Sequence, residues 1–317
     1  METKIIHITK ENIEATAKEA ADVWAQGGLV AFPTETVYGL GGNGLNKEAS
    51  KKIYAAKGRP SDNPLILHIA DMEQFYPLIK TDNAKIIARA EALADVFWPG
   101  PLTMILPKAD NIPYETTGGL DTVAIRMPSH LVARALLQEC KMPIAAPSAN
   151  ASGKPSGTKI EDIKKEFDGK VATIIDAGMV DIGLESTVVK VIENKVVILR
   201  PGKITKEDIE KLGIEVEIDK NILGKCSENE KVLSPGMKYK HYAPNTKCLM
   251  IYSKDEQKMV NKINEFVNGK DALIVCKDCN YSKYNVKHII KMGNSLEEIA
   301  HNIFSILREV DKYNANI

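Results

Sequence analysis

The 317-residue sequence has no excess of either charge, few cysteines and no apolar run long enough to cross a bilayer. It holds 42 Lys and Arg against 42 Asp and Glu, so its formal net charge is zero. This balance argues against a protein that coats nucleic acid or a membrane through bulk charge, although it permits a local basic pocket. The five cysteines are scattered and odd in number, which does not predict a disulfide framework.

Two further absences narrow the setting. The N-terminal residues become polar again by Lys10, so we expect no signal peptide. No stretch approaches the ~20 apolar residues that span a bilayer, so we expect a cytoplasmic protein without a membrane partner. The Walker pattern G-x-x-x-x-G-K-[ST] is absent, and we do not interpret any segment as a Rossmann dinucleotide fingerprint.

Residues 1–208 alternate short β-rich runs with helical patterns, which predicts an α/β domain with a mixed sheet. Apolar residues recur with the helical period from Ile13 to Trp24, and Gly27 follows as a stop signal. Further helices are expected at 46–56, 83–95 and 131–139. Strands are expected at 4–8, 29–32, 65–69, 102–106, 123–125, 144–146, 173–175, 187–191 and 196–199.

The chain changes character after residue 208. Residues 209–245 are charged and weakly periodic and then Pro-bounded, so we expect a linker with specific contacts near its end. A second alternation follows over 246–317 and predicts a small βαβ-like domain. Its strands are expected at 248–252, 272–276 and 286–290, and its helices at 255–267 and 296–313.

A first polar segment lies where the strand at 29–32 ends. It places three hydroxyls and a carboxylate before a Gly-rich turn. Thr34, Thr36 and Tyr38 could orient a small polar substrate while backbone N–H groups approach an anion. An ordinary strand-to-loop transition is the alternative interpretation.

Cations form a second group of candidates. Lys57 and Arg59 follow a helix end and could clamp a phosphate, or they could simply complement the helix dipole. Arg126 ends an apolar strand, where a guanidinium needs an anion, either a substrate or an internal carboxylate. His68 at another strand end could bind a substrate carboxylate or be a core histidine.

Hydroxyls and amides gather at further strand ends. Residues 143–158 hold Ser148 and Asn150 among other donors, which suit a triphosphate or a Mg²⁺ site. Ser186 begins one strand and Arg200 ends another. Each signal is weak alone. Together they predict one anion-binding cleft in a neutral protein, into which four cations point: Lys57, Arg59, Arg126 and Arg200.

These segments, in this order, resemble the motifs of the YrdC-like family. The matching motifs are Pro33-Thr-Glu-Thr-Val-Tyr-Gly-Leu-Gly41, Lys57-Gly-Arg-Pro60, Asn63-Pro-Leu65, Ile125-Arg-Met-Pro128, Ala146-Pro-Ser-Ala-Asn150, Ser152-Gly153, Glu185-Ser-Thr187 and Leu199-Arg-Pro-Gly202. The chain is similar to the L-threonylcarbamoyladenylate synthases of that family in their longer, two-domain form, because Ser234–Pro244 resembles their linker. The resemblance implies a twisted mixed α/β sheet with a concave basic cavity over 1–208. It also implies a linker over 209–245 that contacts the active site, and a small Rossmann-like domain over 246–317.

The resemblance implies a nucleotidyltransferase that joins L-threonine, bicarbonate or CO₂, and ATP into threonylcarbamoyl-AMP and pyrophosphate. A downstream tRNA threonylcarbamoyltransferase would use the product on tRNAs that read ANN codons. The residues implied for threonine are Thr36, His68, Arg126 and Ser186. Those implied for ATP are Arg59, Asn63, Thr122, Ala146, Ser148, Ser156, Arg200 and the linker residue Tyr242. The catalytic residues would be Lys57, Arg59, Ser148 and Asn150, with Mg²⁺ near the last two and held mainly by the ATP phosphates.

Two other functions remain open at this point. An RNA-binding YrdC-like module is disfavoured by the zero net charge and the lack of interleaved aromatics, which leaves direct tRNA binding open. A carbamoyladenylate-forming carbamoyltransferase would carry zinc-finger segments with paired cysteines upstream, which are absent here. Cys276-x-x-Cys279 is a single pair without a second pair or a nearby His, and it predicts no metal site.

Overall fold

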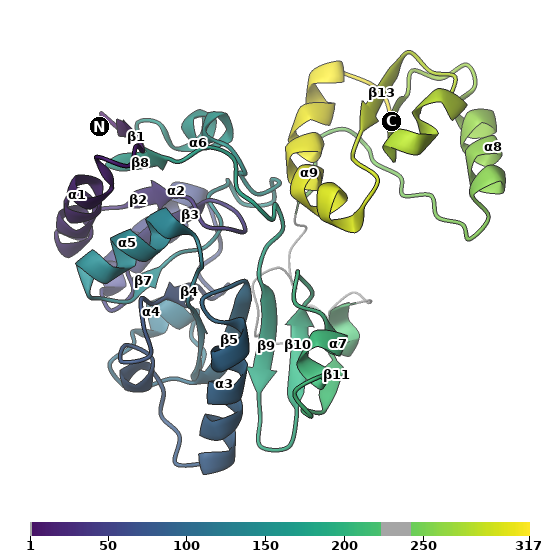
Figure 1. Ribbon diagram of the computed structural model, residues 1–317. Coiled ribbons are helices and arrows are strands. Elements are labelled where there is room, and N and C mark those ends of the chain that lie inside the picture. Colours follow the sequence, from purple (N-terminus) through teal and green to yellow (C-terminus); the bar gives the residue numbers. More distant parts are fainter. Residues whose placement is uncertain (1, 223–241) are drawn as a thin grey trace. The chain divides into compact units, whose positions relative to one another are not determined.

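The computed structural model describes residues 2–222 and 242–317, which divide into two compact units (Figure 1). The first unit takes in 2–152 and 156–222, and the second takes in Gly153–Pro155 with 242–317. Within these described ranges, no helix is long and apolar enough to cross a membrane.

One mixed sheet forms the centre of the first unit. The strand order in the described residues is β1-β8-β2-β3-β7-β4-β6-β5-β9-β10-β11, with parallel and antiparallel pairs side by side, so the expected α/β class is confirmed. The strands are β1 (Lys4–His7), β2 (Val30–Phe32), β3 (Gly39–Asn43), β4 (Ile66–His68), β5 (Leu102–Pro107), β6 (Thr122–Arg126), β7 (Ile144–Ala145), β8 (Thr173–Asp176), β9 (Thr187–Val191), β10 (Val196–Arg200) and β11 (Val216–Ile218).

Local signals place both ends of α2 (Lys47–Lys57). Asn46 caps α2 by accepting from the backbone N–H groups of Glu48 and Ala49, and Gly58 ends the same helix at φ 58°. The helices are α1 (Ile13–Ala25), α2 (Lys47–Lys57), α3 (Ala84–Phe97), α4 (Tyr114–Thr117), α5 (Leu131–Cys140), α6 (Ile160–Phe167) and α7 (Lys206–Glu210), with 3₁₀ turns at Tyr76–Leu78 and Lys220–Ile222.

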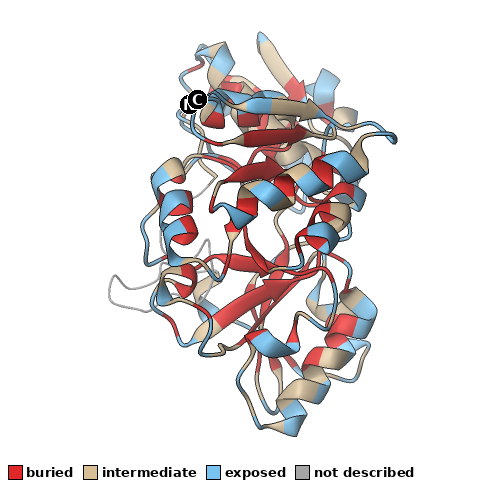
Figure 2. Ribbon diagram, turned by 90° about the vertical axis from the view of Figure 1, so that its left-hand side faces the viewer, coloured by how far each residue is buried: buried red, intermediate tan, exposed pale blue. Residues whose placement is uncertain are grey.

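Strand alternation divides the core between the two faces of the sheet. On β2, Val30 and Phe32 pack with α1 and α5, whereas Ala31 points into the other cluster with α2 and α3. Figure 2 shows the strands mostly buried and the helices exposed on one side only. Trp24 of α1 anchors its layer by donating its indole N–H to the carbonyl of Gly41 at 3.0 Å.

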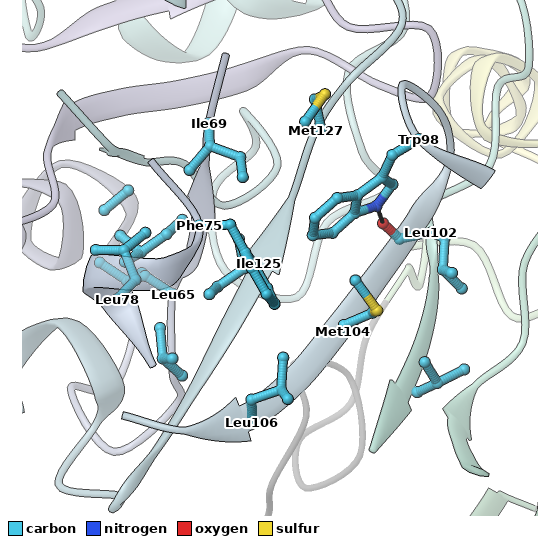
Figure 3. Close-up of a cluster of buried hydrophobic side chains, with 14 of the residues drawn as sticks. Leu65, Ile69, Phe75, Leu78, Trp98, Leu102, Met104, Leu106, Ile125 and Met127 are labelled. Atoms are coloured by element: carbon cyan, nitrogen blue, oxygen red, sulfur yellow. Dashed lines mark hydrogen bonds between the residues drawn. The ribbon is translucent and has the colours of Figure 1, made fainter. Parts of the chain in front are cut away.

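A cluster around Trp98 covers one face of β5 and β6 (Figure 3). The indole of Trp98 meets the ring of Phe75 edge to face at 5.7 Å and donates to the carbonyl of Leu102 at 2.7 Å. Met104 of β5 and Ile125 of β6 point into this cluster. Because side chains alternate along a strand, the residues next to Met104 and Ile125 on β5 and β6 point to the opposite face of the sheet.

The sheet continues past residue 208, where the sequence predicts that the linker starts. α7 follows a capping box formed by Thr205 and Asp208, and β11 pairs in parallel with β10. Ile209 and Val216 are buried in the same cluster as Trp98 and Ile125. Packing against that cluster therefore stabilises this segment, although its sequence shows only weak periodicity. The linker prediction for 223–241 lies outside the described residues.

The second unit is a small α/β layer. β12 (Leu273–Cys276) and β13 (His288–Lys291) pair in parallel. Ile274 packs towards α8 (Glu256–Val267), whereas Leu273 packs with Ile306 of α9 (Leu296–Glu309), so the two helices lie on opposite faces. Short 3₁₀ turns occupy Asp278–Lys283 and Val310–Tyr313.

The strand predicted at 248–252 is wrong. This segment has no regular structure, and its apolar side chains are open to solvent, with Met250 96% and Tyr252 81% exposed. A strand needs a partner to satisfy its backbone, and β12 instead bonds to the end of the chain, where Leu273 donates to the carbonyl of Ile317. Apolar β-rich composition alone therefore did not specify a strand here.

Candidate active site

Two predicted site residues, His68 and Arg126, share one face of the sheet with side chains of two neighbouring strands. His68 of β4 lies opposite Arg126 of β6, which lies opposite Thr103 of β5, and Thr103 lies opposite Val188 of β9. Side chains in one such row point the same way. Ile125 and Met104 lie in the Trp98 cluster (Figure 3). Arg126 and Thr103 are their neighbours along β6 and β5, so they face the opposite side of the sheet.

Apolar side chains complete this face. They form a separate buried cluster of Ile66, Ile105, Ala124, Val188 and Leu199, drawn from five strands. Thr122 begins β6 and lies on the same face as Arg126, about 13 Å along the strand at ~3.3 Å per residue. This face therefore has polar side chains at the strand ends, such as Arg126 and Thr122, and buried apolar side chains between them.

Arg126 is held in a buried ion pair. Its Nη2 lies 2.6 Å from Oε1 of Glu35, and the two side chains are 4% and 5% exposed. Its Nη1 donates to the hydroxyl of Thr36 at 2.8 Å and its Nε to the carbonyl of Gly100 at 3.3 Å. Burial alone would raise the pKa of Glu35, but the charge of Arg126 and its hydrogen bond outweigh it and lower that pKa. The pair is therefore charged at neutral pH.

His68 is a neutral side chain in this environment. It is only 3% exposed, and burial together with the nearby charge of Arg126 lowers its pKa to about 3. Its Nδ1 lies 3.2 Å from the carbonyl of Ile66. If His68 contacts threonine, as the family motif implies, it does so as an uncharged imidazole.

A second arginine–carboxylate pair lies at the ends of β9 and β10. Nη1 of Arg200 lies 2.6 Å from Oε2 of Glu185, and Nη2 of Arg200 donates to the hydroxyl of Ser186 at 3.0 Å. Oε1 of Glu185 accepts from the hydroxyl of Ser156 at 2.8 Å. Thr103 lies 2.7 Å from Ser186 between their hydroxyl oxygens. These contacts join Ser156 and Arg200, predicted for ATP, to Ser186, predicted for threonine.

Lys57 holds the loop of the serine–asparagine motif. Its ammonium is on a side chain only 3% exposed, and it donates to the backbone carbonyls of Ser148 and Asn150, the latter at 2.6 Å. The hydroxyl of Ser148 donates to Oδ1 of Asn150 at 2.6 Å. The predicted catalytic residues Lys57, Ser148 and Asn150 are thus in one hydrogen-bonded group, in which Lys57 organises backbone as well as supplying charge.

The other predicted ATP residues are placed as follows. Arg59 donates to the carbonyl of Pro64 at 3.0 Å, and the carbonyl of Asn63 accepts from Tyr54, so both lie on the ordered loop after α2. Ala146 donates its backbone N–H to Ile66 of β4 at 2.9 Å. Tyr242 belongs to the second unit, where its ring stacks on Phe304 at 5.0 Å. Its role towards ATP stays a prediction.

The oxygen chemistry of the motif suits magnesium. Mg²⁺ prefers oxygen ligands and keeps several waters or phosphate oxygens, and the hydroxyl of Ser148 and the amide oxygen of Asn150 are ligands of that type. Among the described residues, no group of three or more His, Cys, Asp or Glu could hold a metal alone. These two residues can therefore supply part of a Mg²⁺ shell, with the remainder from a bound nucleotide.

Sequence reasoning missed three side chains that build this site. Glu35 and Glu185 lie inside quoted motifs but received no role, although a buried arginine requires a nearby anion. Thr103 is a polar residue at a buried position in the apolar run Leu102–Leu106, which is a signal that could have identified it. Among the contacts of the described residues, Arg126 and Arg200, two of the cations expected to face an anionic substrate, are paired with carboxylates.

Comparisons with known proteins agree with this architecture. A family profile described as "Telomere recombination" matches residues 22–202, and one described as "Threonylcarbamoyl-AMP synthase, C-terminal domain" matches 204–317. The threonylcarbamoyl-AMP synthase of Pyrococcus abyssi is 44% identical over 99% of this chain and 91% of its own length. That of Bacillus subtilis is 46% identical over 93% of this chain and 84% of its own length.

Solved structures give the same result. The crystal structure of P. abyssi Sua5 complexed with L-threonine matches with a TM-score of 0.90 and 43% identity, covering 100% of this chain and 91% of that one. Escherichia coli YciO matches 64% of this chain and 97% of its own with a TM-score of 0.55 and 23% identity, a likeness in fold alone. Both the catalytic and the C-terminal regions are matched, and the chain therefore belongs to the threonylcarbamoyl-AMP synthase family.

Proposed function

We propose that this protein synthesises threonylcarbamoyl-AMP and pyrophosphate from L-threonine, bicarbonate or CO₂, and ATP. Relatives that carry the name of this enzyme match nearly the whole chain, and a solved structure that matches it, P. abyssi Sua5, is a complex with L-threonine. The observation that carries the proposal is the buried sheet face on which Thr103 links Arg126 to Ser186 and Arg200, because it can hold the carboxylate of threonine beside the phosphates of ATP.

The threonine carboxylate would bind at Arg126. A guanidinium has five N–H groups. Among the described contacts, hydrogen bonds to Thr36 and Gly100 engage two of them, and the ion pair with Glu35 lies at Nη2 and accounts for a third. The remaining two can donate to a carboxylate in the charge-assisted geometry that arginine favours. His68, on the neighbouring strand β4, is neutral, so it can form a hydrogen bond with the substrate without adding a second positive charge beside Arg126.

The reaction requires two anions to approach each other. The amine of threonine attacks CO₂ and loses a proton to form a carbamate, and a carbamate oxygen then attacks the α-phosphorus of ATP. The bond to the leaving pyrophosphate breaks in the same displacement. Lys57, Arg59 and Arg200 would offset the repulsion between carbamate and triphosphate, which is the main task of residues in this type of transfer. Mg²⁺, when bound beside Ser148 and Asn150, would supply charge neutralisation to the phosphates.

The product would be passed on. Threonylcarbamoyl-AMP is a mixed anhydride that water destroys, so a cytoplasmic tRNA threonylcarbamoyltransferase that consumes it is the expected downstream partner. Direct tRNA binding is the second candidate function. Steep salt dependence of tRNA binding without pyrophosphate release would favour that function over synthesis.

The test is pyrophosphate release with each substrate omitted in turn. We expect release only when threonine, bicarbonate and MgATP are all present, and we expect Arg59→Ala to abolish it while the thermal unfolding temperature is retained. Lys51→Ala is the matched control, because Lys51 is an exposed cation on α2 paired only with Glu48 in the described contacts. Release from ATP without threonine, or with any amino acid, would refute the assignment.

A further inference from the structure

Two glutamates on the site face have no role in the reaction as proposed. Glu35 and Glu185 are both buried or nearly so, and each lies 2.6 Å from one arginine, Arg126 and Arg200 respectively. A buried pair of this kind rarely adds stability over an apolar replacement, because both charges lose their hydration. A requirement for geometry at the arginine explains such a pair better than a requirement for stability.

The hydrogen bonds around Arg126 have a fixed direction. The carbonyl of Val37 can only accept, so the hydroxyl of Thr34, 2.6 Å away, donates to it. The proton of Thr34 is then used, and the hydroxyl of Thr36, 2.8 Å from that of Thr34, must donate to Thr34. Arg126 in turn donates to Thr36. The fully buried Thr36 hydroxyl therefore has no proton left to donate to a substrate, and its oxygen accepts from Arg126.

The backbone that carries Glu35 is itself fixed. The carbonyl of Glu35 accepts from the N–H of Ile182 at 2.8 Å, and the carbonyl of Thr36 accepts from Gly183 at 3.1 Å. Arg126 is therefore held on three sides, by Glu35, by Thr36 and by the carbonyl of Gly100. Such a guanidinium has lost its rotational freedom before the substrate arrives, which lowers the entropy cost of binding a carboxylate.

We propose that Glu35 is a positioning residue for threonine, which acts through Arg126 by aiming its two remaining N–H groups at the substrate carboxylate. This inference rests on the proposed function of the same site. Glu185 occupies the equivalent place beside Arg200 and Ser156 and positions the ATP half. The two glutamates therefore differ in the substrate that each one serves.

The test compares three glutamate-to-glutamine variants in steady-state pyrophosphate release. For Glu35→Gln we expect the KM for threonine to rise about 10- to 100-fold, the value of one charge-assisted hydrogen bond, with the KM for ATP changed less than about twofold. For Glu185→Gln we expect the reverse. Glu48→Gln, in an exposed ion pair of α2, should change neither. Equal rises in the KM for threonine and the KM for ATP in Glu35→Gln would overturn the proposal. They would mean that the substitution disturbs the whole site rather than the position of threonine.

A double-mutant cycle shows whether Glu35 acts through Arg126. When Arg126→Lys is already present, adding Glu35→Gln should raise the KM for threonine by a further factor of less than about two. If the two residues acted independently, the double variant would show the product of the two single-variant increases. If Glu35→Gln does not fold, Glu35→Asp keeps the charge and shortens the reach, and it should also raise the threonine KM selectively. A wild-type enzyme that releases no threonine-dependent pyrophosphate contradicts the proposed function. An active wild type with an unaffected Glu35→Gln variant contradicts this inference alone.

Discussion

His68 should make the first unit lose stability as the pH falls. Its pKa is lowered from 6.5 to about 3 by burial and by Arg126, so the folded ring stays neutral where the unfolded ring takes up a proton. The unfolded state then binds more protons between pH 6.5 and 3, and the free energy of unfolding decreases as pH falls through that window. The stabilisation is fully present above pH 6.5.

The magnitude follows from the distance below the unfolded pKa. At pH 4.5 the unfolded ring is two pH units below its pKa of 6.5, and each unit corresponds to about 1.4 kcal/mol, so His68 alone should account for a loss of about 3 kcal/mol. This figure requires only that the folded pKa lies below 4.5. Other groups that titrate in the same range also change the free energy of unfolding. The contribution of His68 is therefore the difference between the wild type and a variant that lacks the imidazole.

Urea unfolding of the wild type and of His68→Gln at pH 7.5 and 4.5 measures this contribution. The sequence has two tryptophans, Trp24 and Trp98, and both lie in the first unit, so their fluorescence reports on the unit that contains His68. The wild type should lose about 3 kcal/mol more than the variant between the two pH values. Equal losses within about 0.5 kcal/mol, or an NMR signal of the His68 ring that titrates near pH 6.5, would refute a buried neutral histidine.

Two further substitutions test the hydrogen bonds and the close packing of the site. Lys57→Met keeps the length of the side chain but leaves the carbonyls of Ser148 and Asn150 without their buried donor, so unfolding in urea should show a loss of about 2–5 kcal/mol together with loss of turnover. Gly202→Ala would place a Cβ 2.5 Å from the backbone nitrogen of Thr187 and 2.7 Å from the carbonyl of Glu185, so the start of β9 must shift. The KM for ATP should rise at least about tenfold, and an unchanged KM would show that this backbone is not rigid.

Local signals predicted much of the first unit. The helix over 46–56 was expected from Asn46 as its N-cap, and the structure confirms both the cap and the helix. The strands expected at 102–106 and 187–191 are short runs rich in β-forming residues, and they form β5 and β9. These elements are determined by residues within a few positions of each other, which is why the sequence alone locates them.

The partners of the site residues could not be predicted in the same way. Arg126 was expected to need an anion, either a substrate or an internal carboxylate, and the structure supplies Glu35, which is 91 positions away by number. That pairing depends on the register of β4, β6 and β5 and on the loop before β3, none of which is local information. The strand prediction for residues 248–252 failed for the same reason. An apolar run becomes a strand only where a partner strand pairs with it, and no strand among the described residues pairs with this one.

The paired arginines also predict how threonine binding responds to salt. The carboxylates of Glu35 and Glu185 lie 2.6 Å from their arginines, so the opposite charges of each pair cancel at a distance and neither pair projects a long-range positive field. Threonine must then be held by short, buried hydrogen bonds, which ions in solution barely screen. At saturating MgATP, the KM for threonine should change less than about twofold between 0.05 and 0.5 M KCl. A rise of about fivefold or more, measured by pyrophosphate release, would mean that the carboxylate of threonine is held by charges that ions in solution can screen rather than by buried hydrogen bonds.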